Sequence, residues 1–279
     1  MPLFPGFDVV DVSVDGTTIH GRVGGSGPPL LLLHGIPETH LMWRHLAPEL
    51  AERFTVVATD LRGYGRSSVG TVDDHSMRAL AAEQLAVMRA LGHDRFAVVG
   101  HDRGARCAYR MALDHPENVA SLVVLDVVPT AEAFARADRE FALGYWVWSF
   151  LAAPAPVPEQ LVLGAPQTLV DHMLDSWSDD PGAFPPWVRE RSTASFRDPA
   201  RVHAVCEQSR AAAEAELEAS RRLGAPEHDL YVAELRERGV PVLYVAGNHD
   251  CWGGEILRED DAVRLRAYAL IDDFLEAHA

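Results

Sequence analysis

The stretch that decides the fold reads Phe96-Ala97-Val98-Val99-Gly100-His101-Asp102-Arg103-Gly104-Ala105-Arg106. It starts as a short apolar run, which is typical of a buried strand, and it continues into residues with the three- and four-residue apolar spacing of a helix. Gly100 and Gly104 flank Asp102, and glycine allows the tight turn that joins a strand directly to a helix. The stretch therefore predicts a strand, a sharp turn at Asp102 and a helix over 103–115.

Similar short apolar strands recur on both sides of this turn. They are predicted at 29–33, 54–59, 122–125 and 240–245, and a hairpin is predicted from 9–14 and 17–23 around Asp15-Gly16. Helical spacing lies between the strands at 41–53, 76–91 and 103–115. This alternation predicts an α/β fold with a mostly parallel sheet flanked by helices.

The strand pattern stops for about a hundred residues in the second half of the chain. Helical, proline-interrupted segments are predicted there over 131–151, 161–177 and 199–222. An insertion of helices between two sheet strands is expected to lie over the strand ends, where open parallel sheets bind ligands. We therefore predict a core of residues 1–129 and 239–279 with an inserted helical cap of residues 130–238.

Composition and charge limit the class of protein. The chain has 279 residues, 48% of them hydrophobic, and a formal net charge of −16, with all 25 basic residues being Arg. This mix excludes disordered and collagen-like chains, and the acidic balance argues against partners such as nucleic acid or an anionic membrane. Three scattered cysteines and the lack of a leader-like or membrane-spanning stretch predict a cytoplasmic chain without a metal or cofactor.

Asp102 stands where a strand-turn-helix elbow presents a nucleophile. A carboxylate at this place can attack an sp3 carbon and form an alkyl-enzyme ester, which water must later cleave. The alternative is an Asp that only caps the helix. The loop His34-Gly35-Ile36-Pro37 supports the elbow, because the N–H groups of Ile36 and Arg103 would form an anion hole beside the nucleophile.

Several motifs together make the chain resemble a known family. They are Phe4-Pro5-Gly6-Phe7, Arg22-Val23-Gly24-Gly25, Pro28 to Pro37, Thr39-His40, Met42-Trp43, Asp60-Leu61-Arg62-Gly63-Tyr64-Gly65, Gly100 to Arg106, Leu125 to Thr130 and Trp148 to Pro156. From the N-terminus to about Arg210 the chain resembles α/β-hydrolases of the haloacetate (fluoroacetate) dehalogenase type. The resemblance implies that fold, with Asp102 as nucleophile and Asp126 as the acid that orients a catalytic His.

The resemblance also implies that Arg103 and Arg106 hold the carboxylate of a small anionic substrate. The two residues lie one helical turn apart, and guanidinium groups bind carboxylates in a bidentate fashion. The alternative is that both arginines only form ion pairs with Asp102 or Asp126. An anion would depend on these local charges because the net charge of the chain is −16.

The chain departs from the family in the pocket that receives the leaving halide. Val147 stands where the family has a His, and Ser209 stands where it has a Tyr. Of the three expected donors to halide, Trp148 remains. Since each lost donor to a leaving anion costs a few kcal/mol, fluoride release is expected to be impaired.

A second departure concerns the base that activates water. Gly254 stands where the family has its catalytic His, and too few residues follow 245 for a further helix, strand and loop. His249 is the substitute we consider, although it also fits a loop His without a catalytic duty. We expect a structural role for His101.

The sequence thus predicts a hydrolase whose Asp102 displaces a leaving group from a small 2-substituted carboxylate. Two alternatives remain: a repurposed hydrolase acting on another substrate that is bulkier or less demanding, and a non-catalytic protein that binds carboxylates. An epoxide hydrolase ranks lower, because two activating cap tyrosines cannot be assigned. The seventh strand would leave an exposed sheet edge, so we also predict a homodimer.

Overall fold

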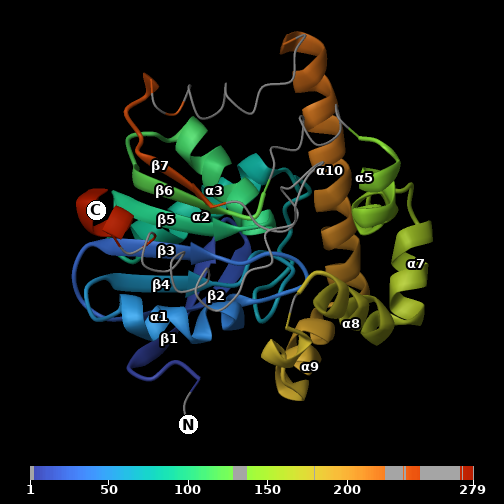
Figure 1. The fold of residues 1–279 in the computed structure, drawn as a ribbon, viewed down its shortest axis with the longest axis horizontal. Coiled ribbons are helices and arrows are strands. Elements are labelled where there is room, and N and C mark those ends of the chain that lie inside the picture. Colours follow the sequence, from blue (N-terminus) through green and yellow to red (C-terminus); the bar gives the residue numbers. More distant parts are fainter. Residues whose placement is uncertain are drawn as a thin grey trace.

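The computed structural model describes residues 3–127, 137–178, 180–223, 235, 237–245, 271 and 273–278, with the backbone alone for residue 181 and residues 215–223. Within this part of the chain a central sheet lies between two layers of helices (Figure 1). Further helices gather beyond one end of the sheet, to the right in Figure 1. The predicted α/β fold with a mostly parallel, helix-flanked sheet is confirmed.

The described sheet has seven strands in the order β1-β2-β4-β3-β5-β6-β7. The strands are β1 (Phe7–Val14), β2 (Thr17–Gly24), β3 (Pro29–Leu33), β4 (Thr55–Thr59), β5 (Phe96–His101), β6 (Val119–Leu125) and β7 (Val242–Val245). β1 pairs with β2 and β2 with β4 in antiparallel fashion, and all other neighbours are parallel. The predicted hairpin is present, and both Asp15 and Gly16 have positive φ, as a two-residue hairpin turn requires.

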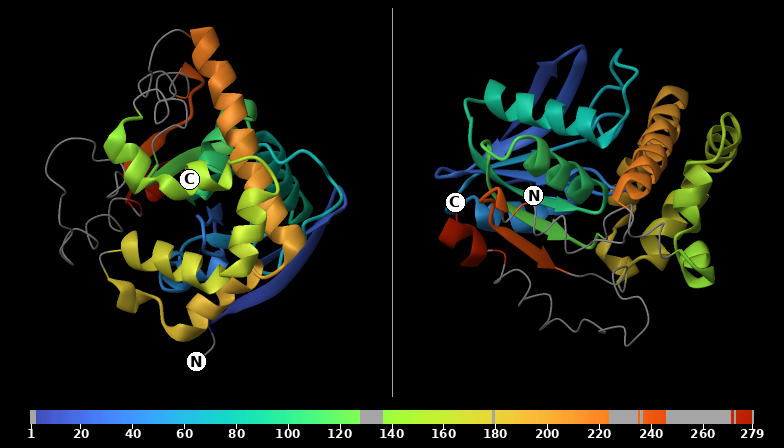
Figure 2. Two further views of the ribbon diagram at one scale, coloured as in Figure 1. Left: turned by 90° about the vertical axis from the view of Figure 1, so that its right-hand side faces the viewer. Right: turned by 90° about the horizontal axis from the view of Figure 1, so that it is seen from above.

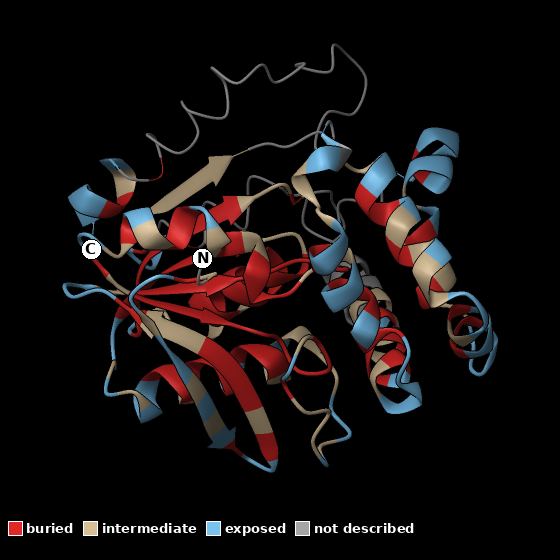
Figure 3. Ribbon diagram, turned by 90° about the horizontal axis from the view of Figure 1, so that it is seen from below, coloured by how far each residue is buried: buried red, intermediate tan, exposed pale blue. Residues whose placement is uncertain are grey.

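The parallel strands are apolar along their whole length because helices cover both faces. Leu31 and Leu33 of β3 pack with α2 (Met77–Ala90) and α3 (Arg103–Asp114), whereas Leu30 and Leu32 pack with η1 (His40–Arg44), α1 (Leu46–Leu50) and Leu275. The two layers are visible in Figure 2, and the burial of the strands between them in Figure 3. Alternate residues of one strand therefore belong to two separate cores.

Between residues 137 and 223, the described part of the chain forms seven helical segments, which make up the layer that faces the strand ends. They are α5 (Arg139–Gly144), α6 (Trp146–Leu151), α7 (Val157–Gly164), α8 (Pro166–Ser176), η2 (Pro181–Ala183), α9 (Pro186–Ser195) and α10 (Pro199–Leu223). The limits of the cap at 130 and 238 remain predictions, because residues 128–136 and 224–234 lie outside the described part.

Proline explains three differences between the predicted and the observed helices, whereas the segment expected over 131–151 is divided into α5 and α6 at Tyr145 without a proline. The helix expected over 41–53 is divided into η1 and α1, since Pro48 lacks an N–H and is tolerated only in the first turn of a new helix. The helix expected over 161–177 is divided in the same way, with Pro166 starting α8. α9 was not predicted, although its first residue, Pro186, is of the type that favours the first position of a helix.

Polar contacts join the end of this helical layer to the loop after β4. The side chain of Gln208 on α10 donates to the Arg62 carbonyl at 3.0 Å, and Arg201 donates to the Gly65 carbonyl at 3.1 Å. From the other side, the Gly65 N–H donates to Ser195 Oγ at 2.9 Å. These buried and half-buried bonds fix α9 and α10 over the carboxyl ends of the strands.

Gly104 allows α3 to approach β3 closely, and this contact gives a stability prediction. A Cβ at Gly104 would lie 2.4 Å from the Leu33 carbonyl oxygen and 2.6 Å from that of His34, where only backbone could move aside. We expect Gly104→Ala to lower the free energy of unfolding by about 2–3 kcal/mol, despite the better helix propensity of Ala. Gly144→Ala is the matched control, because nothing lies within 4 Å of its added Cβ. Urea unfolding measures both, and equal stability of the two variants would contradict the prediction.

β7 is the last strand of the described sheet, next to β6. The predicted homodimer stays a prediction that a mass measurement in solution can check. No helix within the described ranges is both long enough and apolar enough to span a bilayer.

Candidate active site

The elbow at Asp102 has the geometry that the sequence predicts. β5 ends at His101, α3 begins at Arg103, and Asp102 between them has φ 48° and ψ −112°. This region of backbone conformation is sparsely populated by residues other than glycine, and such strain is concentrated at functional sites. The turn also needs Gly100, where an added Cβ would lie 2.5 Å from the Gly104 carbonyl oxygen.

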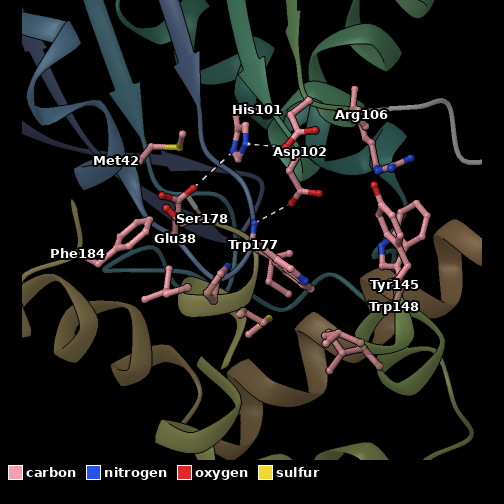
Figure 4. A pocket seen from close by; sticks show the side chains of 18 of the residues that line it. Glu38, Met42, His101, Asp102, Arg106, Tyr145, Trp148, Trp177, Ser178 and Phe184 are labelled. Carbon is pink, nitrogen blue, oxygen red and sulfur yellow. Dashed lines mark hydrogen bonds and ion pairs between the residues drawn. The ribbon is translucent and has the colours of Figure 1, made fainter. Parts of the chain in front are cut away.

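One N–H of the predicted anion hole contacts the Asp102 carboxylate. The Ile36 N–H donates to Asp102 Oδ1 at 2.9 Å (Figure 4). Gly35 makes this approach possible, since a Cβ there would lie 2.7 Å from Asp102 Cβ. The loop after β3 thus holds one carboxylate oxygen and leaves the carboxylate facing a cavity.

The cavity beside Asp102 has a volume of about 370 Å³. Its charged and polar lining comes from Glu38, His101, Asp102, Arg106, Asp126, Tyr145 and Ser178. Its other lining residues are Ile36, Pro37, Met42, Val127, Phe141, Val147, Trp148, Leu151, Met173, Leu174, Trp177, Ala183 and Phe184. Core loops supply most of the charged groups and the cap helices supply most of the apolar ones.

The two arginines of α3 differ in their surroundings. Arg106 lines the cavity, and its guanidinium carbon lies 4.1 Å from the centre of the Trp148 ring, at cation–π distance. Arg103 is buried and donates to Gln208 Oε1 at 3.0 Å and to Ser209 Oγ at 3.1 Å. Arg106 therefore lies at the cavity, whereas the Arg103 side chain is bonded to α10.

The two departures from the family pattern lie in different places. Val147 is buried and lines the cavity next to Trp148, so an apolar side chain forms this part of the wall. Ser209 is a partner of Arg103 instead: its hydroxyl accepts from Arg103 and donates to the Val205 carbonyl at 3.0 Å. Among the described residues, Ser209 does not belong to the cavity lining.

His101, to which the sequence analysis gave a structural role, lies in the wall of the cavity between two carboxylates. Its Nδ1 is 3.5 Å from Glu38 Oε2 and its Nε2 is 3.9 Å from Asp126 Oδ2 (Figure 4). Burial lowers the pKa of His101, but contact with Glu38 and the charges of Asp126 and Asp102 outweigh burial and raise the pKa to about 9. A cation at neutral pH therefore lies among these three carboxylates.

Asp126, the predicted orienting acid, follows β6 and also has a positive φ of 48°. It lines the same cavity as Asp102 and faces His101. Glu38 was missed, although it lies two residues after Ile36 in the loop that supplies the N–H. His249, the predicted substitute base, lies outside the described residues.

The ion pairing of His101 predicts a pH-dependent contribution to stability. Because the folded state raises the pKa from 6.5 to about 9, the contribution is complete below pH 6.5 and is lost as the pH rises through 9. Relative to His101→Gln, the wild-type chain should lose about 2 kcal/mol of unfolding free energy over this window, allowing for partial solvent access. Urea unfolding at several pH values measures the difference, with His93→Gln as the control for loss of an imidazole. A difference that is constant with pH would contradict this assignment.

Two groups of described residues have the side chains that a metal ion could use, His20 with His40 and Asp60, and Glu159 with His203 and Glu207. Neither group lines the cavity. Asp60 is buried, and it accepts from the backbone N–H groups of His40 and Arg66 and lies 2.7 Å from the His40 imidazole. Burial raises the pKa of Asp60, but the His40 charge and these bonds lower it to about 2. This arrangement fits a carboxylate that ties the loops after β3 and β4 together.

Comparison with known proteins agrees with the elbow and the sheet. Residues 28–251 match the family described as alpha/beta hydrolase fold. The chain is 48% identical over 209 residues to fluoroacetate dehalogenase from Burkholderia sp., covering 73% of this chain and 69% of that protein. It is 40% identical over 116 residues to soluble epoxide hydrolase from Corynebacterium sp. (strain C12), covering 42% of this chain and 40% of that protein.

A solved structure is similar to this chain in fold over its whole length. The structure of a proposed epoxide hydrolase from Pseudomonas aeruginosa is similar with a TM-score of 0.82 and 38% identity, covering 100% of both chains. The parallel sheet, the Asp102 elbow between β5 and α3 and these similarities lead to one assignment. The chain belongs to the α/β-hydrolase fold family and, within it, to the haloacetate dehalogenase type.

Proposed function

We propose that this hydrolase displaces a leaving group, such as a halide, from C2 of a 2-substituted carboxylate, with Asp102 as nucleophile. One observation carries the proposal: the Asp102 carboxylate, held at Oδ1 by the Ile36 N–H, faces the same cavity as the Arg106 guanidinium. A substrate carboxylate bound by Arg106 would present its neighbouring carbon to Asp102. Two fixed groups therefore define where the reacting carbon lies.

In the first step, a carboxylate oxygen of Asp102 forms a bond to C2 of the substrate. The bond from C2 to the leaving group breaks at the same time, and the leaving group departs with the electron pair. The product is an ester between Asp102 and the substrate. Trp148, next to Arg106, is the donor proposed for the leaving halide, and the apolar Val147 beside it makes fluoride a poorer leaving group than chloride or bromide.

In the second step, water attacks the carboxyl carbon of Asp102 and cleaves the ester. The Ile36 N–H, which already contacts Oδ1, would stabilise the negative charge that develops on this oxygen. The attacking water must lose a proton to a base, and cleavage releases the 2-hydroxy acid and the Asp102 carboxylate. We propose His249 for this base, with Asp126 as the acid that orients it.

A non-catalytic carboxylate-binding protein is the second candidate. It is favoured by the combination of Arg106 at the cavity with Gly254 in the position of the family's catalytic His. Epoxide opening would also use Asp102, and one described tyrosine, Tyr145, lines the cavity as a donor to an epoxide oxygen. Epoxide hydrolases use two such donors, so this reaction ranks below displacement of halide.

Incubation with chloroacetate, bromoacetate and fluoroacetate tests the proposal. Free halide and the intact mass of the protein are measured together, with styrene oxide as the epoxide substrate. We expect chloride and bromide release to exceed fluoride release. Repeated turnover by the wild-type chain that stops in His249→Ala supports His249 as the base. A stable ester on Asp102 of the wild-type chain would mean displacement without hydrolysis.

The same experiment separates the alternatives. Turnover that is unchanged in His249→Ala would show that His249 is not the base. No halide and no ester, together with carboxylate binding that is lost in Arg106→Gln, would support the binding protein. Diol formed from styrene oxide without any halide from the acids would assign the chain to the epoxide hydrolases.

A further inference from the structure

The size of the cavity exceeds what a haloacetate needs. A haloacetate has five non-hydrogen atoms, and even at about 30 Å³ for each, the share of a whole water molecule in the liquid and so an upper bound, it would occupy no more than about 150 Å³. The cavity measures about 370 Å³. More than half of the volume therefore lies beyond the atoms that Arg106 and Asp102 would hold.

The remaining volume is lined mainly by apolar side chains of the cap. Met173 and Leu174 of α8 are buried cavity residues, and Trp177 and Phe184 complete this end. Phe141 of α5 is also a buried cavity residue, but its ring centre lies 6.4 Å from that of Trp148, on the side of Arg106. In Figure 4, Phe184 and Trp177 lie on the side of the cap, whereas Asp102, His101 and Arg106 lie at the carboxyl ends of the strands. The cavity thus has a charged end around Asp102 and Arg106 and a mainly apolar end, where Glu38 and Ser178 lie beside Phe184 (Figure 4).

We propose that the preferred substrates are 2-substituted carboxylates that bear an aryl group, or an alkyl group of similar size, on the side chain at C2. The inference rests on the proposed function, because it takes Arg106 and Asp102 as the two groups that fix the carboxylate and C2. With these atoms fixed at the charged end, the side chain at C2 enters the space between α8 and the sheet. A small haloacid leaves that apolar end filled with water, and an aryl group displaces this water.

Two acids with the same reacting carbon test this inference. 2-Chloro-3-phenylpropanoate has twelve non-hydrogen atoms, so even at about 30 Å³ for each atom, as an upper bound, it stays within the cavity volume of about 370 Å³. 2-Chloropropanoate lacks only the phenyl ring. Both have a secondary, non-benzylic C2, so their intrinsic reactivity is similar. One buried methylene changes kcat/KM by about ten-fold or more. We therefore expect kcat/KM, measured as chloride release, to be at least 100-fold higher for the phenyl acid than for 2-chloropropanoate.

A variant that fills the apolar end extends the test. Ala183 is a half-buried cavity residue on η2, and Ala183→Trp should lower kcat/KM for the phenyl acid at least ten-fold more than for 2-chloropropanoate. Ala200→Trp is the matched control, because Ala200 is exposed on α10 and does not line the cavity. It should leave the ratio of the two kcat/KM values unchanged. If Ala183→Trp does not fold, the comparison of the two acids on the wild-type chain decides alone.

The outcomes distinguish failure of the proposed substrate class from failure of the proposed function. Chloride release, or an ester on Asp102, from 2-chloropropanoate at a rate equal to or above that of the phenyl acid would overturn the substrate class and leave the proposed function standing. If neither acid gives chloride or an ester on Asp102, the proposed function is overturned and the inference with it. A preference for the phenyl acid that Ala183→Trp reduces and Ala200→Trp does not is the result we expect.

Discussion

Replacing Asp102 with Asn is expected to abolish ester formation and to lower kcat/KM for chloroacetate by about four orders of magnitude or more. The amide has nearly the shape of the carboxylate, but it lacks the charge and nucleophilicity that displacement requires. Its oxygen can still accept from the Ile36 N–H, and the substitution changes no backbone atom and leaves the side-chain volume nearly the same. The loss is therefore expected in chemistry and not in folding, and free halide measures it.

Thermal unfolding is the control for this variant. Asp102→Asn should unfold within a few degrees of the wild-type chain, since a change of 1 kcal/mol shifts the unfolding temperature of a chain of this size by about 2–4 °C. Substantial halide release by a folded Asp102→Asn variant would contradict the role of Asp102 as nucleophile.

Arg106→Gln should raise the KM for chloroacetate by about 100-fold or more. Charge-assisted hydrogen bonds to a carboxylate contribute about 1.5–3 kcal/mol each, and glutamine keeps part of the length of the side chain without its charge. Arg106 lines the cavity beside Trp148, whereas Arg103 donates to Gln208 and Ser209. Steady-state kinetics with increasing chloroacetate measures the effect.

Arg103→Gln gives the informative comparison. It removes two buried bonds to α10, so we expect it to lower the unfolding temperature more than Arg106→Gln does, because Gln208 and Ser209 lose their charged partner. Arg110→Gln, on the same helix but paired with Asp114 away from the cavity, controls for loss of charge. A KM that rises equally in Arg110→Gln and Arg106→Gln would contradict a specific clamp at Arg106.

The sequence was sufficient where local chemistry determines the structure. The elbow follows from the pattern Gly100-x-Asp102-x-Gly104, since the turn needs Gly100 and the close approach of α3 to β3 needs Gly104. The alternation of apolar strands and helices predicted the sheet because burial on both faces leaves a continuous apolar pattern. The contact between Ile36 and Asp102 was also accessible, since parallel strands place their following loops at one edge.

Contacts between distant segments were not accessible from the sequence. The bonds from Arg103 to Gln208 and Ser209 join residues that are more than a hundred positions apart, and their spacing in the chain carries no signal. The backbone of His101 belongs to the sheet, where it ends β5 opposite Leu125, but its side chain lines the cavity. The charged groups around it, Glu38 and Asp126, belong to the loops after β3 and β6, which are distant in the sequence.

The central claim is that Asp102 forms a covalent ester with the substrate. It is tested most directly by the mass of the peptide that contains Asp102 after reaction with chloroacetate in water labelled with oxygen-18. The account predicts that this peptide alone gains mass, as a carboxymethyl ester if hydrolysis is blocked or as oxygen-18 if the ester turns over, because water attacks the Asp102 carboxyl carbon. Release of chloride with an unlabelled Asp102 and oxygen-18 only in the glycolate would show that water attacks the substrate directly, and would contradict the account.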